Sequence, residues 1–266
     1  MSKITIKNIM DAKKEGRKLT MLTAFDYLTA SIIDEAGIDM VLVGDSLGMV
    51  GLGYENTLPV SMEEMLHHTK AVKRGVSKAL IIGDMPFMSY QLSEDEAVDN
   101  ASLFLKEAGA EAVKLEGATE DIKNLVKRLT SIGIPVMGHL GLTPQSIHQF
   151  GGYEVQANTD EAADNLLKDA KALEKAGVFS LVLEKVPADI GKKVSETLGI
   201  PTISCGAGVG CDGQVLVTSD MLGLFTEFKP KFVKRYANLS KEMKKAFEDF
   251  RKEVEEGMFP GKEHSY

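Results

Sequence analysis

Short apolar runs recur along the chain, with amphipathic stretches between them. The runs are rich in Val, Ile and Leu, and they predict strands at 20–23, 40–43, 80–82, 112–115, 135–138, 180–183, 201–204 and 214–217. Polar residues do not alternate with apolar ones inside these runs. Strands of parallel sheets, which are covered on both faces, have this pattern.

The stretches between the runs carry signals for helix ends. Ser61 and Glu64, and again Ser93 and Glu96, have the spacing of a capping box at a helix N-terminus. Gly177 follows the segment 160–176 and predicts the C-terminus of a helix there. The chain therefore alternates predicted strands with predicted helices.

Eight strands alternating with helices over a chain of this length favour a (β/α)8 barrel, or TIM barrel. A doubly wound open sheet is the alternative, because alternation alone does not show that a sheet closes. The segment before residue 20 predicts a helix that closes one end of the barrel, and 240–256 predicts a charged terminal helix followed by a tail. We find no linker, so we expect a single domain over residues 1–266.

Composition and charge narrow the class of protein. The chain has 266 residues, 44 % of them hydrophobic, and a formal net charge of −8, which argues against a nucleic-acid-binding protein. No stretch approaches the roughly 18 apolar residues that span a bilayer, so we expect no membrane segment. Cys205 and Cys211 are the only cysteines and do not form a disulfide framework, so a reduced cytoplasmic location is expected.

Candidate chemistry lies where the predicted strands end. In parallel α/β folds the functional groups collect at the carboxyl ends of the strands. The residues at these ends are Asp45 and Ser46, Asp84, Lys114 and Glu116, His139, and Glu184. Side chains alternate along a strand, so Val41, Val43 and Asp45 are expected on one face, and Lys114 on the face of Glu116. If those faces look into the barrel, four acids and a lysine converge at its mouth.

Three of these acids predict a metal site. Asp45, Asp84 and Glu116 follow successive strands about 4.8 Å apart, so their carboxylates can reach a common ion. Removing each carboxylate from water costs several kcal/mol, and Lys114 supplies only one compensating charge. Oxygen ligands without a set of Cys and His residues favour Mg²⁺. Alternatively, each acid caps the helix that follows it, and Lys114 and Glu116 neutralise each other.

The glycines after the second strand suggest how a ligand is admitted. Glycines at positions 48, 51 and 53 predict a flexible loop that admits or covers a ligand.

Long motifs around these residues resemble those of one enzyme family. They are MLTAFDY, DMVLVGDSLGMV, DMPFMSY, VKLEG, GHLGLTPQSIHQFGGY, LVLEKVP and the closing FPGKEHSY. From about residue 5 to the C-terminus, the chain resembles the ketopantoate hydroxymethyltransferase (3-methyl-2-oxobutanoate hydroxymethyltransferase) family. The resemblance implies a barrel related to the phosphoenolpyruvate/pyruvate-binding enzymes, assembled as a homodecamer.

The resemblance also implies a reaction and roles for residues. The reaction is transfer of a hydroxymethyl group from the co-substrate 5,10-methylenetetrahydrofolate to 3-methyl-2-oxobutanoate, giving 2-dehydropantoate for pantothenate biosynthesis. Asp45, Asp84 and Glu116 match the Mg²⁺ site. The oxo acid is expected at positions matching Asp45, Ser46, Asp84, Lys114 and His139, and Glu184 matches the proton acceptor.

Two alternatives to this function are considered. A related Mg²⁺-dependent barrel lyase or mutase that acts on another 2-oxo acid would share the aspartates. A barrel without activity that serves as an assembly partner would not need the acids at the strand ends.

Overall fold

The computed structural model describes residues 2–266, which divide into two compact units. The first unit ends at Leu216, and the second spans Val217–Tyr266. The expectation of a single domain over residues 1–266 stays a prediction.

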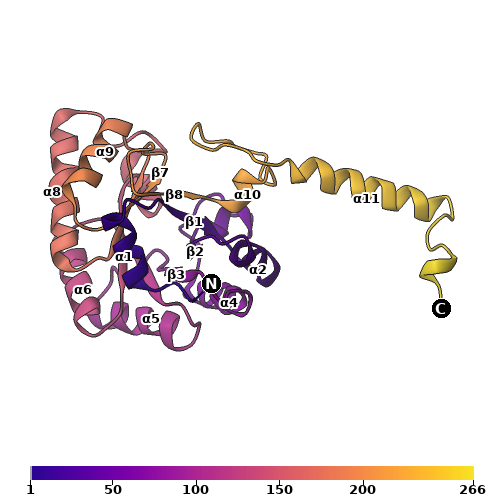
Figure 1. Ribbon diagram of the computed structural model, residues 1–266, viewed down its shortest axis with the longest axis horizontal. Coiled ribbons are helices and arrows are strands. Elements are labelled where there is room, and N and C mark those ends of the chain that lie inside the picture. The colour runs from indigo at the N-terminus through magenta and orange to yellow at the C-terminus, as the bar shows by residue number, and fades with distance from the viewer. Residues whose placement is uncertain (1) are drawn as a thin grey trace. The chain divides into compact units, whose positions relative to one another are not determined.

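Eight parallel strands of the first unit form a closed barrel, in the order in which they occur along the chain (Figure 1). They are β1 (Leu19–Thr23), β2 (Met40–Val43), β3 (Leu80–Asp84), β4 (Ala112–Glu116), β5 (Val136–Gly141), β6 (Ser180–Glu184), β7 (Thr202–Cys205) and β8 (Gly213–Leu216). The register of β8 with β1 places Gly213 beside Leu19 and Leu216 beside Leu22, which closes the sheet. The prediction of a (β/α)8 barrel is confirmed, and the open-sheet alternative is wrong.

Helices surround this barrel because each has one apolar face (Figure 1). The longer ones are α2 (Tyr27–Glu35), α4 (Met62–Gly75), α5 (Glu94–Lys106), α6 (Glu120–Ser131), α8 (Asp160–Ala176) and α9 (Ala188–Thr197). In α6 the buried residues Ile122, Leu125 and Leu129 recur at helical spacing, and this face packs in the core.

The predicted helix ends are formed by the expected residues. Ser61 and Glu64 make the capping box of α4, and at α5 the Ser93 hydroxyl accepts a hydrogen bond from the Glu96 N–H. Gly177 ends α8 with a φ of 115°, a left-handed conformation that glycine adopts readily. Local sequence therefore sets where these helices begin and end.

Two apolar layers lie on either side of the strands. Met40 and Leu42 belong to the inner layer that fills the barrel, whereas Val41 and Val43 belong to the layer between strands and helices. The expectation that Val41 and Val43 point into the barrel with Asp45 is therefore wrong. The alternation ends with β2 at Val43, and the turn that follows re-aims the Asp45 side chain.

The glycines after β2 do not lie in one flexible loop as expected. Residues 47–50 form the short helix α3 (Leu47–Val50). A Cβ atom on Gly48 would lie 2.6 Å from Cγ2 of Val60, so only glycine fits this close approach. Packing rather than mobility explains this glycine.

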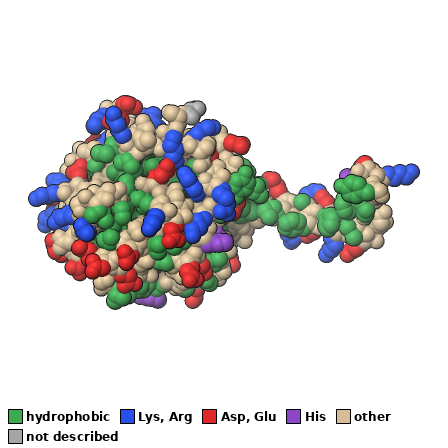
Figure 2. All heavy atoms as spheres, turned by 90° about the horizontal axis from the view of Figure 1, so that it is seen from below, with side chains coloured by type: hydrophobic (Ala, Val, Ile, Leu, Met, Phe, Trp, Pro, Cys, Tyr) green, Lys and Arg blue, Asp and Glu red, His purple; other side chains and the backbone are tan. Residues whose placement is uncertain are grey.

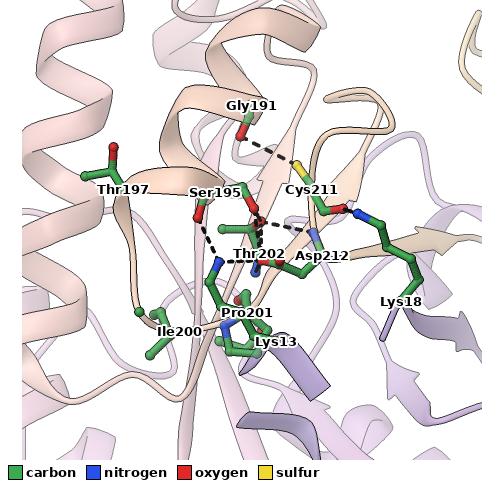
Figure 3. A network of polar contacts seen from close by, with 12 residues as sticks. Lys13, Lys18, Gly191, Ser195, Thr197, Ile200, Pro201, Thr202, Cys211 and Asp212 are labelled. Atoms are coloured by element: carbon green, nitrogen blue, oxygen red, sulfur yellow. Dashed lines mark hydrogen bonds and ion pairs between the residues drawn. The ribbon is translucent and has the colours of Figure 1, made fainter. Parts of the chain in front are cut away.

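The helix α1 (Ile6–Lys14) closes one end of the barrel, as predicted. Ile9 and Ala12 are buried in the inner layer. Lys13 Nζ reaches Asp212 Oδ2 at 2.7 Å, and the same oxygen accepts hydrogen bonds from Ser195 Oγ at 2.9 Å and Thr202 N at 2.8 Å (Figure 3). One carboxylate oxygen thus joins α1, α9 and the start of β7.

Another carboxylate at this end serves the start of β3. Asp34 accepts hydrogen bonds from the backbone N–H groups of Ser77 at 3.0 Å, Lys78 at 2.9 Å and Ala79 at 2.7 Å. Burial alone would raise the pKa of Asp34, but these hydrogen bonds outweigh it and lower the pKa to about 2. The ionised form therefore stabilises the folded chain.

We expect Asp34→Asn to destabilise the protein in a pH-dependent way. The pKa of an unfolded Asp is about 3.9, so the stabilisation is complete above this pH and is lost as pH falls toward about 2. The difference between the folded and unfolded pKa values corresponds to a loss of roughly 2 to 3 kcal/mol at neutral pH. Urea unfolding of both proteins at several pH values measures it. A difference that stays constant down to about pH 2 would contradict the prediction.

The second unit consists of helices and irregular segments. It contains α10 (Thr218–Met221), α11 (Leu239–Glu255) and the short 3₁₀ helix η2 (Lys262–His264), so the predicted terminal helix is confirmed. No residue of α11 is buried. Its apolar residues recur at helical spacing and form an exposed apolar stripe: Met243, Phe247, Phe250 and Val254.

The surface of the first unit carries charges of both signs. Figure 2 shows Lys and Arg side chains intermixed with Asp and Glu on the face drawn there. Among residues 2–266, no helix combines the length and the apolar character needed to cross a membrane.

Candidate active site

Polar side chains gather where strands β2 to β6 end, and we call this group the mouth site. It consists of Asp45 after β2, Asp84 in β3, Lys114 and Glu116 in β4, His139 in β5, and Glu184 in β6. All but Glu184 are buried, with exposures between 1 % and 6 %. The Glu184 side chain is 17 % exposed. The structure therefore brings the predicted charged residues together at one end of the barrel.

Lys114 lies at the centre of the mouth site. The strand register sets Asp84 beside Lys114, and Lys114 Nζ lies 2.8 Å from Asp84 Oδ1 and 3.6 Å from Glu116 Oε1. Burial alone would lower the pKa of Lys114, but the charges of Asp84 and Glu116 outweigh it and raise the pKa. The buried ammonium group therefore stays charged.

Asp45 and Asp84 face each other across β2 and β3. The Asp45 N–H donates to Asp84 Oδ2 at 3.1 Å. Burial, together with the nearby charges of Asp84 and Glu116, raises the pKa of Asp45 well above its usual value. Burial also raises the pKa of Asp84, although the Lys114 charge opposes this. The surroundings of Asp45 and Asp84 therefore do not fully stabilise two ionised carboxylates at this place.

His139 joins two acids that sequence reasoning had not connected. Its Nδ1 lies 3.2 Å from Glu116 Oε1, and its Nε2 lies 3.4 Å from Glu184 Oε2. Burial and the Lys114 charge would lower the pKa of His139, but its close contacts with the two glutamates raise it to about 9. The imidazolium in turn helps Lys114 to lower the pKa of Glu116, although burial opposes this shift.

Ser46 occupies the position before the first residue of α3. Its side chain makes no capping hydrogen bond to that helix. The hydroxyl is therefore not needed to hold the helix and lies next to Asp45 along the chain.

A backbone brace follows Glu184. Lys185 has a φ of 47°, which is uncommon for a residue other than glycine. Its Nζ donates to the Tyr153 carbonyl, and its own carbonyl accepts a hydrogen bond from Gln156 N at 2.8 Å. Burial raises the pKa of Tyr153, and the charges of Glu184 and Asp45 raise it further, so this tyrosine lies in the field of the mouth site.

Sequence reasoning missed two neutral residues of the site. Gln145 and Tyr90 are 5 % and 4 % exposed, and both make hydrogen bonds to mouth-site residues. Gln145 ends the motif segment GHLGLTPQ and Tyr90 ends the motif DMPFMSY, so their place in these motifs could have marked them as site residues. They were passed over because neither is a charged group that ends a strand.

The charge balance of the mouth site suits a divalent cation. With its four carboxylates ionised, the site would hold two more negative charges than the Lys114 ammonium and a protonated His139 balance. Buried Asp84 Oδ1 and Glu116 Oε1 accept no hydrogen bond of regular geometry, although Lys114 and His139 lie within ion-pair distance. A bound cation would supply the missing charge.

The donor set fits Mg²⁺ in an open site. Among residues 2–266, no three His, Cys, Asp or Glu side chains form a ready-made metal cage. Mg²⁺ is usually held by one or two carboxylates together with waters and substrate oxygens, which does not require such a cage. The assignment of Asp45, Asp84 and Glu116 to a metal stays a prediction.

Solved structures share the fold of the chain. Phosphonopyruvate hydrolase in complex with oxalate and Mg²⁺ matches with a TM-score of 0.64 and 14 % identity, over 99 % of this chain and 93 % of that one. A 2,3-dimethylmalate lyase of the PEP mutase/isocitrate lyase superfamily matches with a TM-score of 0.62 and 14 % identity, over 98 % of this chain and 91 % of that one. Identities this low show the fold alone.

Protein sequences show the family. A family model for ketopantoate hydroxymethyltransferase matches residues 3–262. The 3-methyl-2-oxobutanoate hydroxymethyltransferase of Syntrophus aciditrophicus is 59 % identical over 99 % of this chain and 97 % of its own length. The enzyme of that name from Thermoanaerobacter sp. strain X514 is 54 % identical over 99 % of this chain and 96 % of its own length. The sequence matches these enzymes over nearly its full length, and the chain forms the barrel that the resemblance implies. The resemblance is therefore confirmed, and the chain belongs to the ketopantoate hydroxymethyltransferase family.

Proposed function

We propose that the protein transfers a hydroxymethyl group from 5,10-methylenetetrahydrofolate to 3-methyl-2-oxobutanoate and yields 2-dehydropantoate for pantothenate biosynthesis. Family membership supports the reaction. The observation that carries the proposal is the mouth site, where acids, a buried ammonium and an imidazolium converge at the carboxyl ends of the strands. A small anionic oxo acid with its metal fits that combination of charges.

We assign Asp45, Asp84 and Glu116 as the residues that hold Mg²⁺. When bound, Mg²⁺ would act as a Lewis acid toward the carbonyl group of the oxo acid and make the neighbouring C–H more acidic. A phosphonopyruvate hydrolase of the same fold was solved in complex with oxalate and Mg²⁺, which supports Mg²⁺ as the metal.

The remaining groups bind the oxo acid. The charged Lys114 ammonium attracts the substrate carboxylate. Asp45 and Asp84 would hold the oxo acid through the Mg²⁺ that they bind, since their own charges repel the substrate carboxylate. Ser46, whose hydroxyl does not cap α3, offers a hydrogen bond to the oxo acid. His139, held between Glu116 and Glu184, lies beside the site where the substrate would bind.

Glu184 is the base in this proposal. It is the most exposed acid of the mouth site, so its carboxylate can reach a bound substrate. Glu184 removes the proton from C3 of the oxo acid, and the His139 imidazolium holds one Glu184 oxygen in place. In the transfer, the methylene carbon gains a bond to C3 and a bond to the oxygen of a water molecule, while its bonds to N5 and N10 of the folate break. The proton from C3 and one proton of that water end on N5 and N10, so tetrahydrofolate leaves.

The exposed apolar stripe of α11 suggests that the protein assembles with copies of itself. Ion pairs such as Lys244–Glu248 and Arg251–Glu255 occupy other positions of this helix, so its apolar residues remain for contact. A solvent-exposed run of large apolar residues is typical of an interface. We propose a homo-oligomer, a decamer as the resemblance implies, located in the cytoplasm. Cell fractionation tests the location.

Product analysis tests the function. With 3-methyl-2-oxobutanoate, 5,10-methylenetetrahydrofolate and Mg²⁺, we expect 2-dehydropantoate to form, and we expect EDTA to reduce turnover to background until Mg²⁺ is restored. Omission of the folate is the control. Turnover of the oxo acid without folate would instead support a related lyase or mutase, and full activity in EDTA would remove the metal from the proposal.

The role of Glu184 is tested by exchange of the C3 proton for deuterium in the absence of folate. We expect Glu184→Gln to slow this exchange by about 100-fold or more, since general bases contribute at least that much. Glu196→Gln on the exposed face of α9 is the matched control and should exchange as the wild type does. An unchanged rate in Glu184→Gln would show that another group takes the proton.

The oligomer is tested by light scattering. We expect the wild type to have a mass several times that of the 28.9 kDa chain. Introducing aspartates with Phe247→Asp and Phe250→Asp should reduce that mass, because a charge would be buried in the interface. Lys241→Asp, outside the apolar stripe, is the control and should not. A monomeric wild type would refute the assembly.

A further inference from the structure

Gln145 is a buried neutral residue of the mouth site to which the proposed reaction gives no role. It lies in the short 3₁₀ helix η1 (Pro144–Ser146) that follows β5. Its side chain is enclosed, with the residue 5 % exposed. A buried amide has to place two N–H donors and one carbonyl acceptor, so its partners define its orientation.

Both donors of the Gln145 amide are used at the ends of β2 and β3. Nε2 donates to Asp45 Oδ2 at 3.0 Å and to the carbonyl oxygen of Met85 at 2.9 Å. The Met85 carbonyl oxygen can only accept a hydrogen bond, and the ionised Asp45 carboxylate also only accepts. The amide nitrogen of Gln145, rather than its oxygen, therefore has to face them. The bond to the Asp45 carboxylate is of the stronger, charge-assisted kind.

The backbone of the same residue holds a second acid. Gln145 N donates to Glu116 Oε2 at 3.0 Å. Gln145 therefore donates hydrogen bonds to two carboxylates. Asp45 follows β2 and Glu116 ends β4, the two strands on either side of β3. Asp84, the third acid, lies between them on β3 and is already held by the Asp45 N–H and Lys114.

Tyr90 fixes the other side of the amide. Its hydroxyl donates to Gln145 Oε1 at 2.6 Å and accepts from Glu116 N at 3.3 Å. The Tyr90 donor makes a flipped amide unfavourable, because a flip would set N–H against O–H and the amide oxygen against the Asp45 carboxylate. Tyr90 thus acts on Asp45 through Gln145.

We propose that Gln145 is a positioning residue that presents the Asp45 and Glu116 carboxylates to Mg²⁺, with Tyr90 locking its amide in the required orientation. The inference rests on the proposed function only in taking those acids as the metal site. Groups that orient metal ligands in this way affect affinity without touching the ion.

The test measures Mg²⁺ binding by calorimetry, with Mg²⁺ as the only ligand. Gln145→Met keeps the size of the side chain and the backbone bond to Glu116, but it removes every side-chain hydrogen bond. We expect Mg²⁺ to bind about 10- to 100-fold more weakly, the usual effect of losing an outer partner of a metal ligand. Turnover at low Mg²⁺ should fall correspondingly and recover when Mg²⁺ is raised, which a misfolded site would not do.

Two further variants keep the test decisive. Tyr90→Phe should also weaken Mg²⁺ binding, and in the double variant the two effects should not add in full, because Tyr90 acts on Asp45 through Gln145 and its other bond is the 3.3 Å contact with the Glu116 N–H. Gln91→Met is the matched control. Gln91 is exposed and reaches Gln145 Oε1 only at 3.4 Å, so we expect affinity within about twofold of the wild type.

The outcomes separate this inference from the proposed function. If the wild type binds Mg²⁺ and Gln145→Met binds it equally well with an unchanged melting temperature, the positioning role is refuted and the reaction stands. If Gln145→Met fails to fold, Tyr90→Phe decides, and wild-type affinity in that variant refutes the role of the pair. If the wild type itself binds no Mg²⁺, the metal assignment is refuted, and the positioning role is refuted with it.

Discussion

The burial of acids around one ammonium group is the constraint on which the active end of this barrel depends. Carboxylates from β2, β3 and β4 are withdrawn from water, and each loses several kcal/mol of hydration. The contacts of Lys114 with Asp84 and Glu116 offset part of that desolvation cost. The contacts of His139 with Glu116 and Glu184 offset a further part. With all of these groups ionised, negative charge stays in excess, and such an excess would favour a bound cation.

Closure of the barrel makes this arrangement possible. In a parallel sheet all strands end on the same side, and the register sets Asp84 beside Lys114 and Glu116 beside His139. An open sheet would spread the same residues along an edge, where water would screen them. The closed sheet instead gathers them in a low-dielectric mouth, so each charge acts strongly on its neighbours.

The sequence predicted most of the fold, because its signals are local. Buried parallel strands are recognisable as apolar runs, and capping residues such as Ser61 and Gly177 mark where helices begin and end. Acids such as Asp84 are conspicuous because they follow apolar runs. The shared inward face of Val41, Val43 and Asp45 was mispredicted, because a turn after β2 breaks the alternation that holds inside a strand. The contacts of Gln145 were not predictable in this way, since they join residues up to 100 positions apart. The short helix α3 was taken for a flexible loop because a glycine needed for packing looks the same in a sequence as one needed for mobility.

Carboxylates also occupy the opposite end of the barrel, but there they accept hydrogen bonds from the first N–H groups of strands. Asp39 accepts from Thr20, Glu111 from Ile81, and Asp212 from Thr202. These strands are anchored at the end away from the mouth site, so changes of sequence in the loops at the mouth leave the anchoring hydrogen bonds in place. Selectivity for a new oxo acid can therefore evolve by small steps in those loops, while the anchored end is inherited unchanged.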